Sequence, residues 1–412
     1  MRLIKKWAPL VAIFAIGILS AHAENLAAAP QCAQLDLLFS KKIPTLASFT
    51  WSTQAGAADL TAPPRSIALW GDSLTSTRDF MDAALKVAGI STVTALPSFI
   101  QAGMAVPGLR LPLKAACASK GWQTAYAHKQ KRDSSGFSKG FVSLSSENPG
   151  ATISLDFRFP TPSTRVKQLT LLYEKPEPDA SLLLGVSVDD GDESLISLSK
   201  TSASVLQIRP TAPMAAIKIR LVSGKMTVHG FAPSYQEAPA AILDTFSVPG
   251  GLLRGWSYMN ERLFTATPEV AANYSTVLVQ YGTNEGANTD FSAAAYAGYL
   301  RTNLSRMRTF FPRSRCILIG PPDRGVVGAA AQSNPLKYST IHRQIALAQK
   351  QVGAEYRCEF WDWQAAMGGP GSALRWARMN TPQMQQDLTH LTAKGYQISG
   401  QMFAESLLLN KY

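Results

Sequence analysis

The sequence has 412 residues and a formal net charge of +12, and 46% of its residues are hydrophobic. This length and hydrophobic content allow more than one folding unit with a sizeable core. The positive charge favours an anionic partner such as a cell wall or membrane surface, or a dispersed positive surface that affects only solubility. The sequence contains no nucleic-acid-binding motif and no cluster with metal-ligand spacing, so we expect neither a nucleic-acid partner nor a metal.

The chain begins with a predicted export signal at residues 1–23. Basic residues precede the apolar stretch 10–19, and Ala21-His22-Ala23 has the small-residue pattern of a cleavage site. The stretch is short for a transmembrane anchor, and no later stretch could span a membrane, so we expect an exported mature chain that begins at residue 24. Residues 24–60 predict a short helix near 33–39 and then a polar connector.

Residues 61–113 are the predicted first part of an α/β domain. The apolar residues 67–70 predict a buried strand, and residues 78–87 predict a helix. Ser73 lies in the turn between them, where its hydroxyl would face the carboxyl edge of a sheet and the first N–H groups of the helix would lie close to an oxyanion. Taken alone, the turn is equally consistent with a serine that caps the helix.

Residues 114–240 predict an inserted β-sandwich. The segment lacks helical periodicity, and turn sequences such as Asp189-Asp190-Gly191-Asp192 separate its strand-like runs. Short strands at regular spacing favour a sandwich, which a surface loop can accept if the two ends of the insertion lie close together. The strands are expected at 151–159, 168–173, 182–188, 205–208, 216–222 and 226–231. Such a module could hold a glycan, act as a lid or be purely structural.

The α/β pattern resumes in residues 241–412. Apolar strands alternate with helices of more than ten residues, which predicts a parallel sheet with helices on both faces. The strands are expected at 276–280, 315–320 and 355–362, and the helices at 291–311, 337–353 and from 392. The predicted fold class is therefore a three-layer α/β/α parallel sheet with an inserted β-sandwich. Ligands of such sheets bind beyond the carboxyl ends of the strands.

His390 is the histidine best placed to act as a base. A serine hydroxyl needs a general base to become a nucleophile, and the mature chain has four histidines. Only His390 has a carboxylate three residues earlier, Asp387, which could accept a hydrogen bond from the imidazole and hold its tautomer. Without Ser73 in the chain, a helix cap and a surface histidine would be the better interpretation.

Three blocks, Gly71-Asp72-Ser73, Gly282-Thr283-Asn284 and Asp387 with His390, resemble those of the SGNH, or GDSL, hydrolase family and occur in the same order. The resemblance extends from residue 67 to the C-terminus apart from the insertion. It implies a flavodoxin-like α/β fold and a serine ester hydrolase without a cofactor, in which Ser73 is the nucleophile, His390 the base and Asp387 the residue that orients the base.

The resemblance also implies an oxyanion hole. Its donors would be the N–H of Ser73, the N–H of a glycine in the segment 248–256 and the side-chain amide of Asn284. Gly250 aligns best with the family's second block, and Gly251 is the alternative. By residue type alone, the glycines could form an ordinary turn and Asn284 could cap one.

Within the family the chain looks like the bacterial peptidoglycan O-acetylesterases. These enzymes remove acetyl groups from the C6 hydroxyl of N-acetylmuramic acid and carry a carbohydrate-binding-like module at the same place. Glu285 departs from the commoner Gly-x-Asn-Asp pattern, and Leu74 stands where this branch often has His. Trp361 and Trp363 alternate along a predicted strand and would belong either to the core or to a sugar-stacking platform that binds substrate.

The predicted function is a periplasmic or otherwise secreted serine esterase that removes O-acetyl groups from a cell-wall glycan. One alternative keeps the triad in an O-acetyltransferase for an envelope polysaccharide, or in a lipase or arylesterase. The other is a glycan-binding protein with an inactive hydrolase domain, against which the intact Ser73, Asn284, Asp387 and His390 argue.

Four cysteines, Cys32, Cys117, Cys316 and Cys358, can form two disulfides in an exported chain, with three possible connectivities. Cys316 and Cys358 each lie near the start of a predicted strand, so they could form a disulfide if those strands are neighbours. Cys32 and Cys117 would then pair only by elimination.

Overall fold

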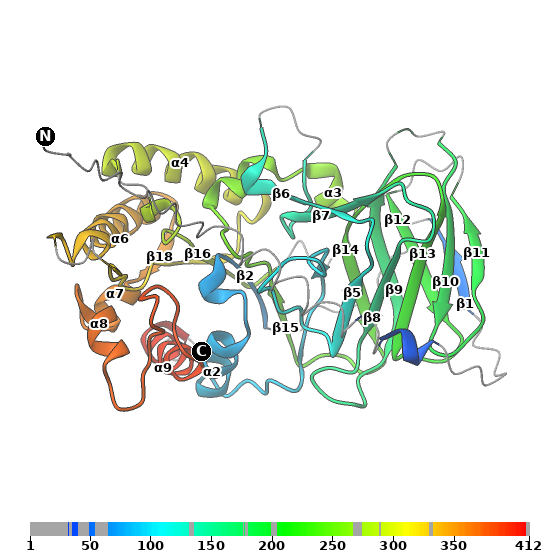
Figure 1. Cartoon of the computed structure of the whole chain (residues 1–412), viewed down its shortest axis with the longest axis horizontal. Coiled ribbons are helices and arrows are strands. Elements are labelled where there is room, and N and C mark those ends of the chain that lie inside the picture. Colours follow the sequence, from blue (N-terminus) through cyan, green and yellow to red (C-terminus); the bar gives the residue numbers. More distant parts are fainter. Residues whose placement is uncertain are drawn as a thin grey trace, which may run out of the picture.

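The computed structural model describes residues 32, 35–39, 49–53, 65–131, 136–175, 177, 180–198, 204–266, 274–287, 290–328 and 333–408. Figure 1 shows two lobes side by side, one with helices around a sheet and one composed almost entirely of strands. The predicted signal at residues 1–23 and most of the connector lie outside the described residues. Among the helices that are described, none is long and apolar enough to cross a membrane.

The first lobe contains a six-stranded sheet in the order β18-β17-β16-β2-β15-β3. All its pairings are parallel, as the alternation of strands and helices predicted. β2 precedes residues 114–240 in the chain, and both of its neighbours, β15 and β16, follow them. The strands span Ser66–Gly71 (β2), Ala95–Leu96 (β3), Ala241–Thr245 (β15), Thr276–Gln280 (β16), Arg315–Ile319 (β17) and Cys358–Trp361 (β18).

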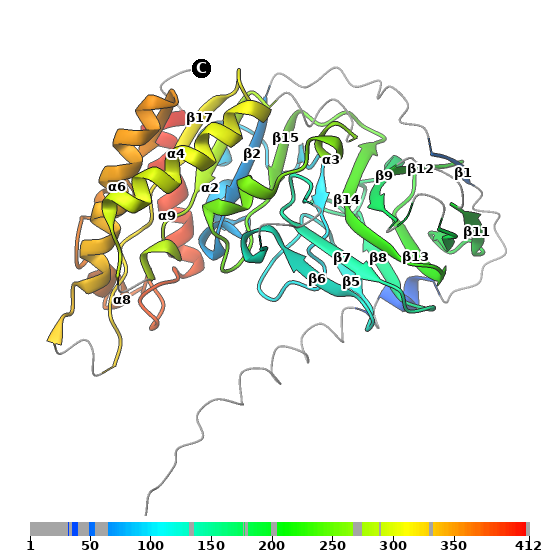
Figure 2. The ribbon, with the colours of Figure 1, turned by 90° about the horizontal axis from the view of Figure 1, so that it is seen from above.

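Helices cover both faces of this sheet because β2 directs alternate side chains into two cores. Ala68 and Trp70 belong to the core that includes α4 and α6, whereas Ile67 and Leu69 belong to the core that includes α2 and α9. Figure 1 shows the two helix pairs on opposite sides of the strands, and Figure 2 shows α4 and α6 side by side. The predicted three-layer α/β/α sheet is therefore confirmed.

The long helices span Asp79–Val87 (α2), Ala293–Phe310 (α4), Lys337–Glu355 (α6) and Ala393–Phe403 (α9). Shorter helices span Glu261–Thr265 (α3), Trp363–Ala366 (α7) and Ser372–Ala377 (α8). The 3-10 turns span Ser73–Thr75, Ala127–Lys129, Leu253–Tyr258 and Glu285–Ala287, and a π-helical turn spans Ala404–Leu408.

The second lobe consists of two antiparallel sheets on a shared apolar core. One sheet has the order β1-β12-β9-β14-β7-β6, with β4 also paired to β14, and the other has the order β11-β10-β13-β8-β5. Leu171, Leu184 and Ile219 are among the buried residues between them. The strands span Phe49–Ser52 (β1), Ile100–Gln101 (β4), Ala115–Ala118 (β5), Gln123–Tyr126 (β6), Val142–Ser146 (β7), Thr152–Asp156 (β8), Val166–Glu174 (β9), Leu183–Val188 (β10), Ser194–Ser197 (β11), Val205–Pro210 (β12), Ala216–Ser223 (β13) and Met226–Tyr235 (β14).

Two strands of this sandwich come from outside residues 114–240. β1 lies in the segment interpreted above as a polar connector, and it pairs antiparallel with β12. β4 lies in the predicted first part of the α/β domain and pairs with β14. Strands of two to four residues have too little periodicity to reveal a distant partner, so the sequence did not indicate them.

Both disulfides connect segments that are distant in sequence. Cys316 and Cys358 are paired residues of the neighbouring strands β17 and β18. They form a disulfide, as expected if their two strands were neighbours. Cys32 is bonded to Cys117 in β5, which attaches the N-terminal segment to the sandwich.

The two lobes are packed against each other through a common core. Phe141 of the sandwich lobe lies edge-on to Trp256, which in turn contacts Trp70 of β2. Beside them Lys139 is fully buried, with its Nζ 3.1 Å from the Tyr274 hydroxyl and 3.9 Å from Asp244 Oδ2. Burial lowers the pKa of Lys139 to about 8, against the opposing effect of Asp244. Contacts across this boundary therefore hold the sandwich in a defined position beside the parallel sheet.

Candidate active site

The turn that carries Ser73 is shaped by Gly71 and Asp72. A side chain at Gly71 would collide with Thr75 Oγ1, so this tight turn requires glycine. Ser73 begins a 3-10 turn, and Asp72 caps that turn by accepting a hydrogen bond from the Leu74 N–H at 2.9 Å. Because Asp72 is the capping residue, the alternative of Ser73 as a helix cap does not apply.

Ser73, His390 and Asp387 form one chain of hydrogen bonds. Ser73 Oγ lies 3.0 Å from His390 Nε2, and His390 Nδ1 lies 2.6 Å from Asp387 Oδ2. Ser73 follows β2 at the middle of the sheet, whereas the other two residues lie in the loop before α9, more than 300 positions later. Folding thus brings together the three residues that the sequence indicated, in the geometry of a nucleophile, a base and an orienting acid.

Asp387 is positioned by its own loop. Its Oδ1 accepts hydrogen bonds from the N–H groups of Thr389 and His390, both at 3.0 Å, which leaves Oδ2 for the imidazole. Burial alone would raise the pKa of Asp387, but the hydrogen bonds from the His390 side chain and from the two backbone groups outweigh it and lower the pKa. The carboxylate therefore stays ionised at neutral pH, where it can stabilise a protonated His390.

Asp72 connects the nucleophile turn to the neighbouring strand. Its N–H donates to Gln280 Oε1, and Gln280 Nε2 donates to Asp72 Oδ2, both at 3.2 Å. Gln280 is the last residue of β16, so this pair holds the ends of two adjacent strands in register. Burial raises the pKa of Asp72 to about 6 despite the hydrogen bonds that it accepts. These contacts give Asp72 a structural role in shaping the turn that carries Ser73.

The segment 248–252 lies against the end of β2 and supplies a candidate oxyanion donor. The N–H groups of Ser73 and Gly250 have no hydrogen-bond partner among the described residues, whereas the Gly251 N–H donates to Val248 O at 2.8 Å. A Cβ on Gly251 would lie 3.0 Å from Gly71 O, so glycine is needed for this close approach. Between the two glycines, Gly250 therefore has the N–H that remains available to a ligand.

Asn284 is fastened to the same segment. Its Nδ2 donates to Gly251 O at 2.9 Å, which uses one of its two amide hydrogens and leaves the other. The contact spans 33 positions, so Asn284 does not act as a local turn cap. It joins the loop after β16 to the segment that carries Gly250, the two places where oxyanion donors were expected.

Glu285 forms a second connection between these loops, which sequence reasoning missed. Its Oε1 accepts from the Leu253 N–H at 2.9 Å, and its Oε2 accepts from the Gly282 N–H at 3.0 Å. Burial raises the pKa of Glu285 to about 7. The sequence offered one indication of this contact, because Glu stands where Asp is commoner. The Glu side chain is one methylene longer, and its carboxylate reaches the Leu253 N–H.

Comparison with known protein families finds a match for part of the chain. The sequence model described as the GDSL-like Lipase/Acylhydrolase family matches residues 227–398, which include Asn284, Asp387 and His390. The chain is an acyl-ester hydrolase that is similar to this family over less than half of its length. The Ser73 turn lies outside the matched range, before the sandwich in the sequence.

A peptidoglycan O-acetylesterase of known structure shares the fold of this GDSL-like hydrolase, and other solved structures are similar to a lesser degree. A peptidoglycan O-acetylesterase is similar with a TM-score of 0.62 and 21% identity, over 85% of this chain and 93% of that chain. A lipase/acylhydrolase from Enterococcus faecalis has a TM-score of 0.29 and 18% identity, over 40% of this chain and 75% of that chain. A family two carbohydrate esterase from Cellvibrio japonicus has a TM-score of 0.27 and 12% identity, over 70% and 97%. No curated protein matches the sequence.

The two tryptophans considered above as a sugar platform are core residues in this GDSL-like hydrolase. Trp361 is 5% exposed and Trp363 is completely buried. Only Trp361 lies on β18, because the strand ends there and Trp363 begins α7, where its Nε1 donates to Ser399 Oγ at 2.9 Å. The substrate-binding role for Trp361 and Trp363 is therefore wrong, since neither indole has a face available to a sugar.

The other described histidines lie elsewhere in the hydrolase. His342 is buried in α6 with Nδ1 2.6 Å from Pro322 O, and burial lowers its pKa to about 4. His229 lies in β14 with Nε2 2.9 Å from Glu174 Oε2. The pKa of His128 is also lowered to about 4, mainly by burial. Among these histidines, only His390 is hydrogen-bonded to Ser73.

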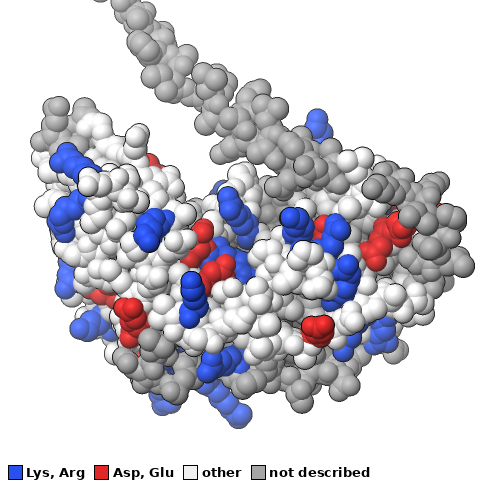
Figure 3. Space-filling model, turned by 90° about the horizontal axis from the view of Figure 1, so that it is seen from below, with Lys and Arg blue, Asp and Glu red and all other residues white. Residues whose placement is uncertain are grey.

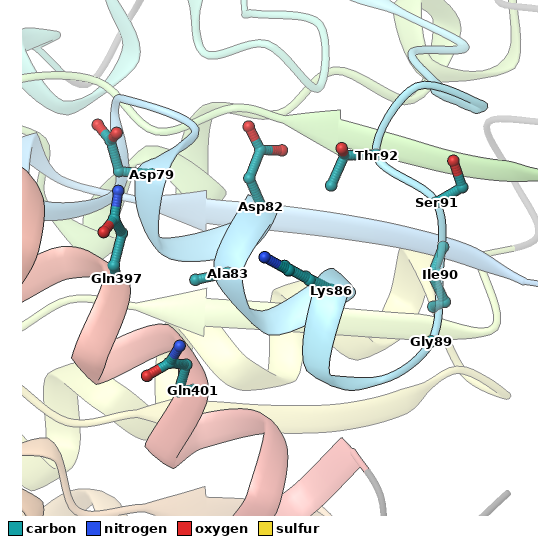
Figure 4. Close-up of a pocket in the computed structure, with 10 residues that line it drawn as sticks. All are labelled: Asp79, Asp82, Ala83, Lys86, Gly89, Ile90, Ser91, Thr92, Gln397 and Gln401. Atoms are coloured by element: carbon teal, nitrogen blue, oxygen red, sulfur yellow. The ribbon is translucent and has the colours of Figure 1, made fainter.

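Charge and cavities on the hydrolase surface do not by themselves mark the site. Figure 3 shows Lys and Arg side chains spread over one face with Asp and Glu among them, as expected for a dispersed positive surface. A cavity of about 780 Å³ lies between α2 and α9, where Gln397 and Gln401 project toward α2 (Figure 4). None of the triad residues lines this cavity.

Proposed function

We propose that this GDSL-like hydrolase is an exported serine esterase that removes O-acetyl groups from a cell-wall glycan. The observation that carries the proposal is the chain of hydrogen bonds from Ser73 Oγ through His390 to Asp387. It supplies a nucleophile, a base and a charge that stabilises the protonated base, which are the requirements of acyl transfer through serine.

In the proposed acylation step, Ser73 Oγ attacks the acetyl carbonyl carbon while His390 Nε2 takes the hydroxyl proton. Negative charge develops on the former carbonyl oxygen, where it would meet the N–H groups of Ser73 and Gly250 and the free amide hydrogen of Asn284. The bond to the sugar oxygen then breaks, and His390 returns its proton to that oxygen. The products of this step are the deacetylated glycan and acetyl-Ser73.

Deacylation repeats these steps with water as the nucleophile. His390 takes a proton from the water as the water oxygen attacks the acetyl carbon of acetyl-Ser73. When the second tetrahedral intermediate collapses, the proton passes to Ser73 Oγ and acetate leaves. Asp387 remains ionised throughout, because the pKa of its carboxyl is lowered, and it stabilises the imidazolium at each stage.

The proposed substrate is supported by the fold shared with a peptidoglycan O-acetylesterase. That similarity covers 85% of this chain, so it includes strands of the sandwich as well as the parallel sheet. Export to the periplasm or beyond is supported by the basic residues, apolar stretch and small-residue cleavage pattern of residues 1–23. An exported enzyme meets the cell-wall glycan directly.

The deciding experiment incubates the chain from residue 24 with O-acetylated peptidoglycan and measures released acetate. We expect acetate from the wild type and none above background from Ser73→Ala. Parallel reactions contain a deacetylated oligosaccharide acceptor or a long-chain ester. Acetyl transfer to the acceptor without free acetate, or a strong preference for the long-chain ester, would contradict the proposal. N-terminal sequencing of protein from fractionated cells tests export, with residue 24 as the expected first residue.

A further inference from the structure

A cleft of about 460 Å³ lies between the two lobes, close to the nucleophile. One wall is the start of α2, with Arg78, Asp79 and Asp82, and begins at Thr77, four positions after Ser73. The other wall contains residues of the segment 103–114, which leads into β5, together with β5 itself and Phe159 of the sandwich lobe. The cleft is thus built by both lobes and exists only where they meet.

The cleft wall is hydrogen-bonded to the nucleophile turn. Ser76 Oγ donates to Ser73 O at 3.0 Å, and the Arg110 N–H donates to Ser76 O at 3.2 Å. Ser76 Oγ also lies 3.4 Å from Gly108 O. A group bound in this cleft would therefore be held at a fixed position relative to Ser73.

The charges in the cleft leave two cations without a partner. Arg78 donates twice to Asp82, at 3.0 and 2.9 Å, and its guanidinium lies over the Phe159 ring. Arg110 and Lys114 are exposed, and neither side chain has a hydrogen bond or ion pair with any described residue. Since Asp79 and Asp82 balance only two of the three arginine and lysine charges, the cleft has a net positive charge that favours an anion.

The rest of the lining is apolar. Met104, Leu109, Leu111 and Phe159 face the same space. Sugar rings present C–H faces to apolar and aromatic side chains, while their substituents need polar partners. A lining that combines apolar side chains with two unpaired cations suits a glycan that bears carboxylates better than a neutral glycan or a free inorganic anion.

We infer that this cleft binds an anionic part of the acetylated glycan, with Arg110 and Lys114 pairing with its carboxylates and Leu109, Leu111 and Phe159 contacting its sugar. The inference rests on the proposed function and names the chemistry of the substrate next to the acetyl group. The carboxylate belongs either to a substituent of the sugar or to a peptide attached to the glycan. Both sources present the same group to the two cations.

Binding can be measured without turnover in full mature chains that carry Ser73→Ala. Calorimetry gives Kd for three O-acetylated ligands: an N-acetylglucosamine–N-acetylmuramic acid disaccharide, the same disaccharide with its peptide, and a neutral chito-disaccharide. We expect the carboxylate-bearing ligands to bind more tightly than the neutral one. The tighter of the first two identifies the source of the carboxylate. Binding of the neutral ligand as tightly as the charged ones would overturn the inference.

Substitutions then test the two cations. Arg110→Gln with Lys114→Gln should weaken binding of the charged ligand about tenfold, the size expected for loss of two exposed ion pairs, and should reduce its salt dependence. Arg110→Lys should keep most of the affinity because it keeps the charge. Lys120→Gln, which removes an exposed cation outside the cleft, is the matched control. An unchanged Kd in the double variant, or an equal loss in Lys120→Gln, would overturn the inference.

This design separates the two proposals. Binding of the charged disaccharide that depends on Arg110 and Lys114, together with no acetate release by the wild type, would refute the esterase proposal and keep the cleft assignment. If the wild type releases acetate but binding of the charged disaccharide does not depend on Arg110 and Lys114, the esterase proposal stands and the cleft assignment is refuted. Melting temperatures of all variants confirm that a lost affinity does not reflect a lost fold.

Discussion

Asn284 provides the sharpest test of how the hydrolase stabilises an oxyanion. One hydrogen of its Nδ2 is donated to Gly251 O at 2.9 Å, and the other remains for the substrate. Asn284→Ala removes both. Loss of a single oxyanion donor typically lowers kcat by about 10²–10³-fold, or about 2.7–4 kcal/mol. We expect a loss of at least this size, because Gly251 also loses a contact that positions the Gly250 N–H.

The assay is steady-state hydrolysis of a soluble aryl acetate, with kcat and KM measured separately. The donor acts on charge that develops only in the transition state, so kcat should fall and KM should change little. Asn148→Ala is the matched control, because its amide also donates to a glycine carbonyl, Gly121 O at 3.1 Å, in the sandwich lobe. A raised KM with full kcat in Asn284→Ala would refute the reasoning and assign Asn284 to ground-state binding.

The remaining predictions concern the other site residues and stability. Ser73→Ala should abolish aryl acetate hydrolysis without lowering the melting temperature, and residual turnover would rule out Ser73 as the nucleophile. Asp387→Asn should lower kcat by roughly 10⁴-fold, because the imidazole loses its orienting charge, and a mild loss would reduce the triad to a dyad. Burial raises the pKa of Glu285 from 4.5 to about 7, so between these pH values the folded state keeps a proton on Glu285 that the unfolded state loses, and the contribution of Glu285 to stability should fall as pH rises. Glu285→Gln should lack this contribution, so the free energy of unfolding of the wild type relative to that of Glu285→Gln, measured with denaturant, should fall from pH 4.5 to 7. Parallel pH dependences of the two proteins would contradict the assignment. Cys316→Ser removes the disulfide to Cys358, which joins residues 42 positions apart, and should reduce the free energy of unfolding by about 4 kcal/mol. Guanidinium titrations measure this change, and an unchanged midpoint would count against it.

The sequence alone predicted the parts of the site that depend on neighbouring residues. The apolar strand, glycine turn and helix around Ser73 follow from local periodicity and turn chemistry, and β2 and α2 lie within one residue of their predicted bounds. β16 has the predicted bounds. Asp387 and His390 are three positions apart, so their contact needed only a local loop. These features depend on residues that are close together in the sequence, so they can be predicted without knowing how the rest of the chain folds.

Contacts between distant segments were decided by the tertiary structure. The side-chain pattern of a strand indicates which residues are buried but not which strand lies beside it, so β1 and its pairing with β12 were missed. The sequence left Trp361 and Trp363 open to either a core or a sugar-binding role, and the structure shows that both are buried in the core that includes α9.

The same holds for the second half of the site. Glu285 acts on Leu253, 32 positions away, and the cleft with Arg110 exists only because the sandwich docks beside α2. Hydrogen-bond geometry and cavity shape depend on where separate segments meet in space. A linear pattern therefore identifies the reacting groups of this hydrolase, while the packing of its two lobes determines how they are held and what can bind beside them.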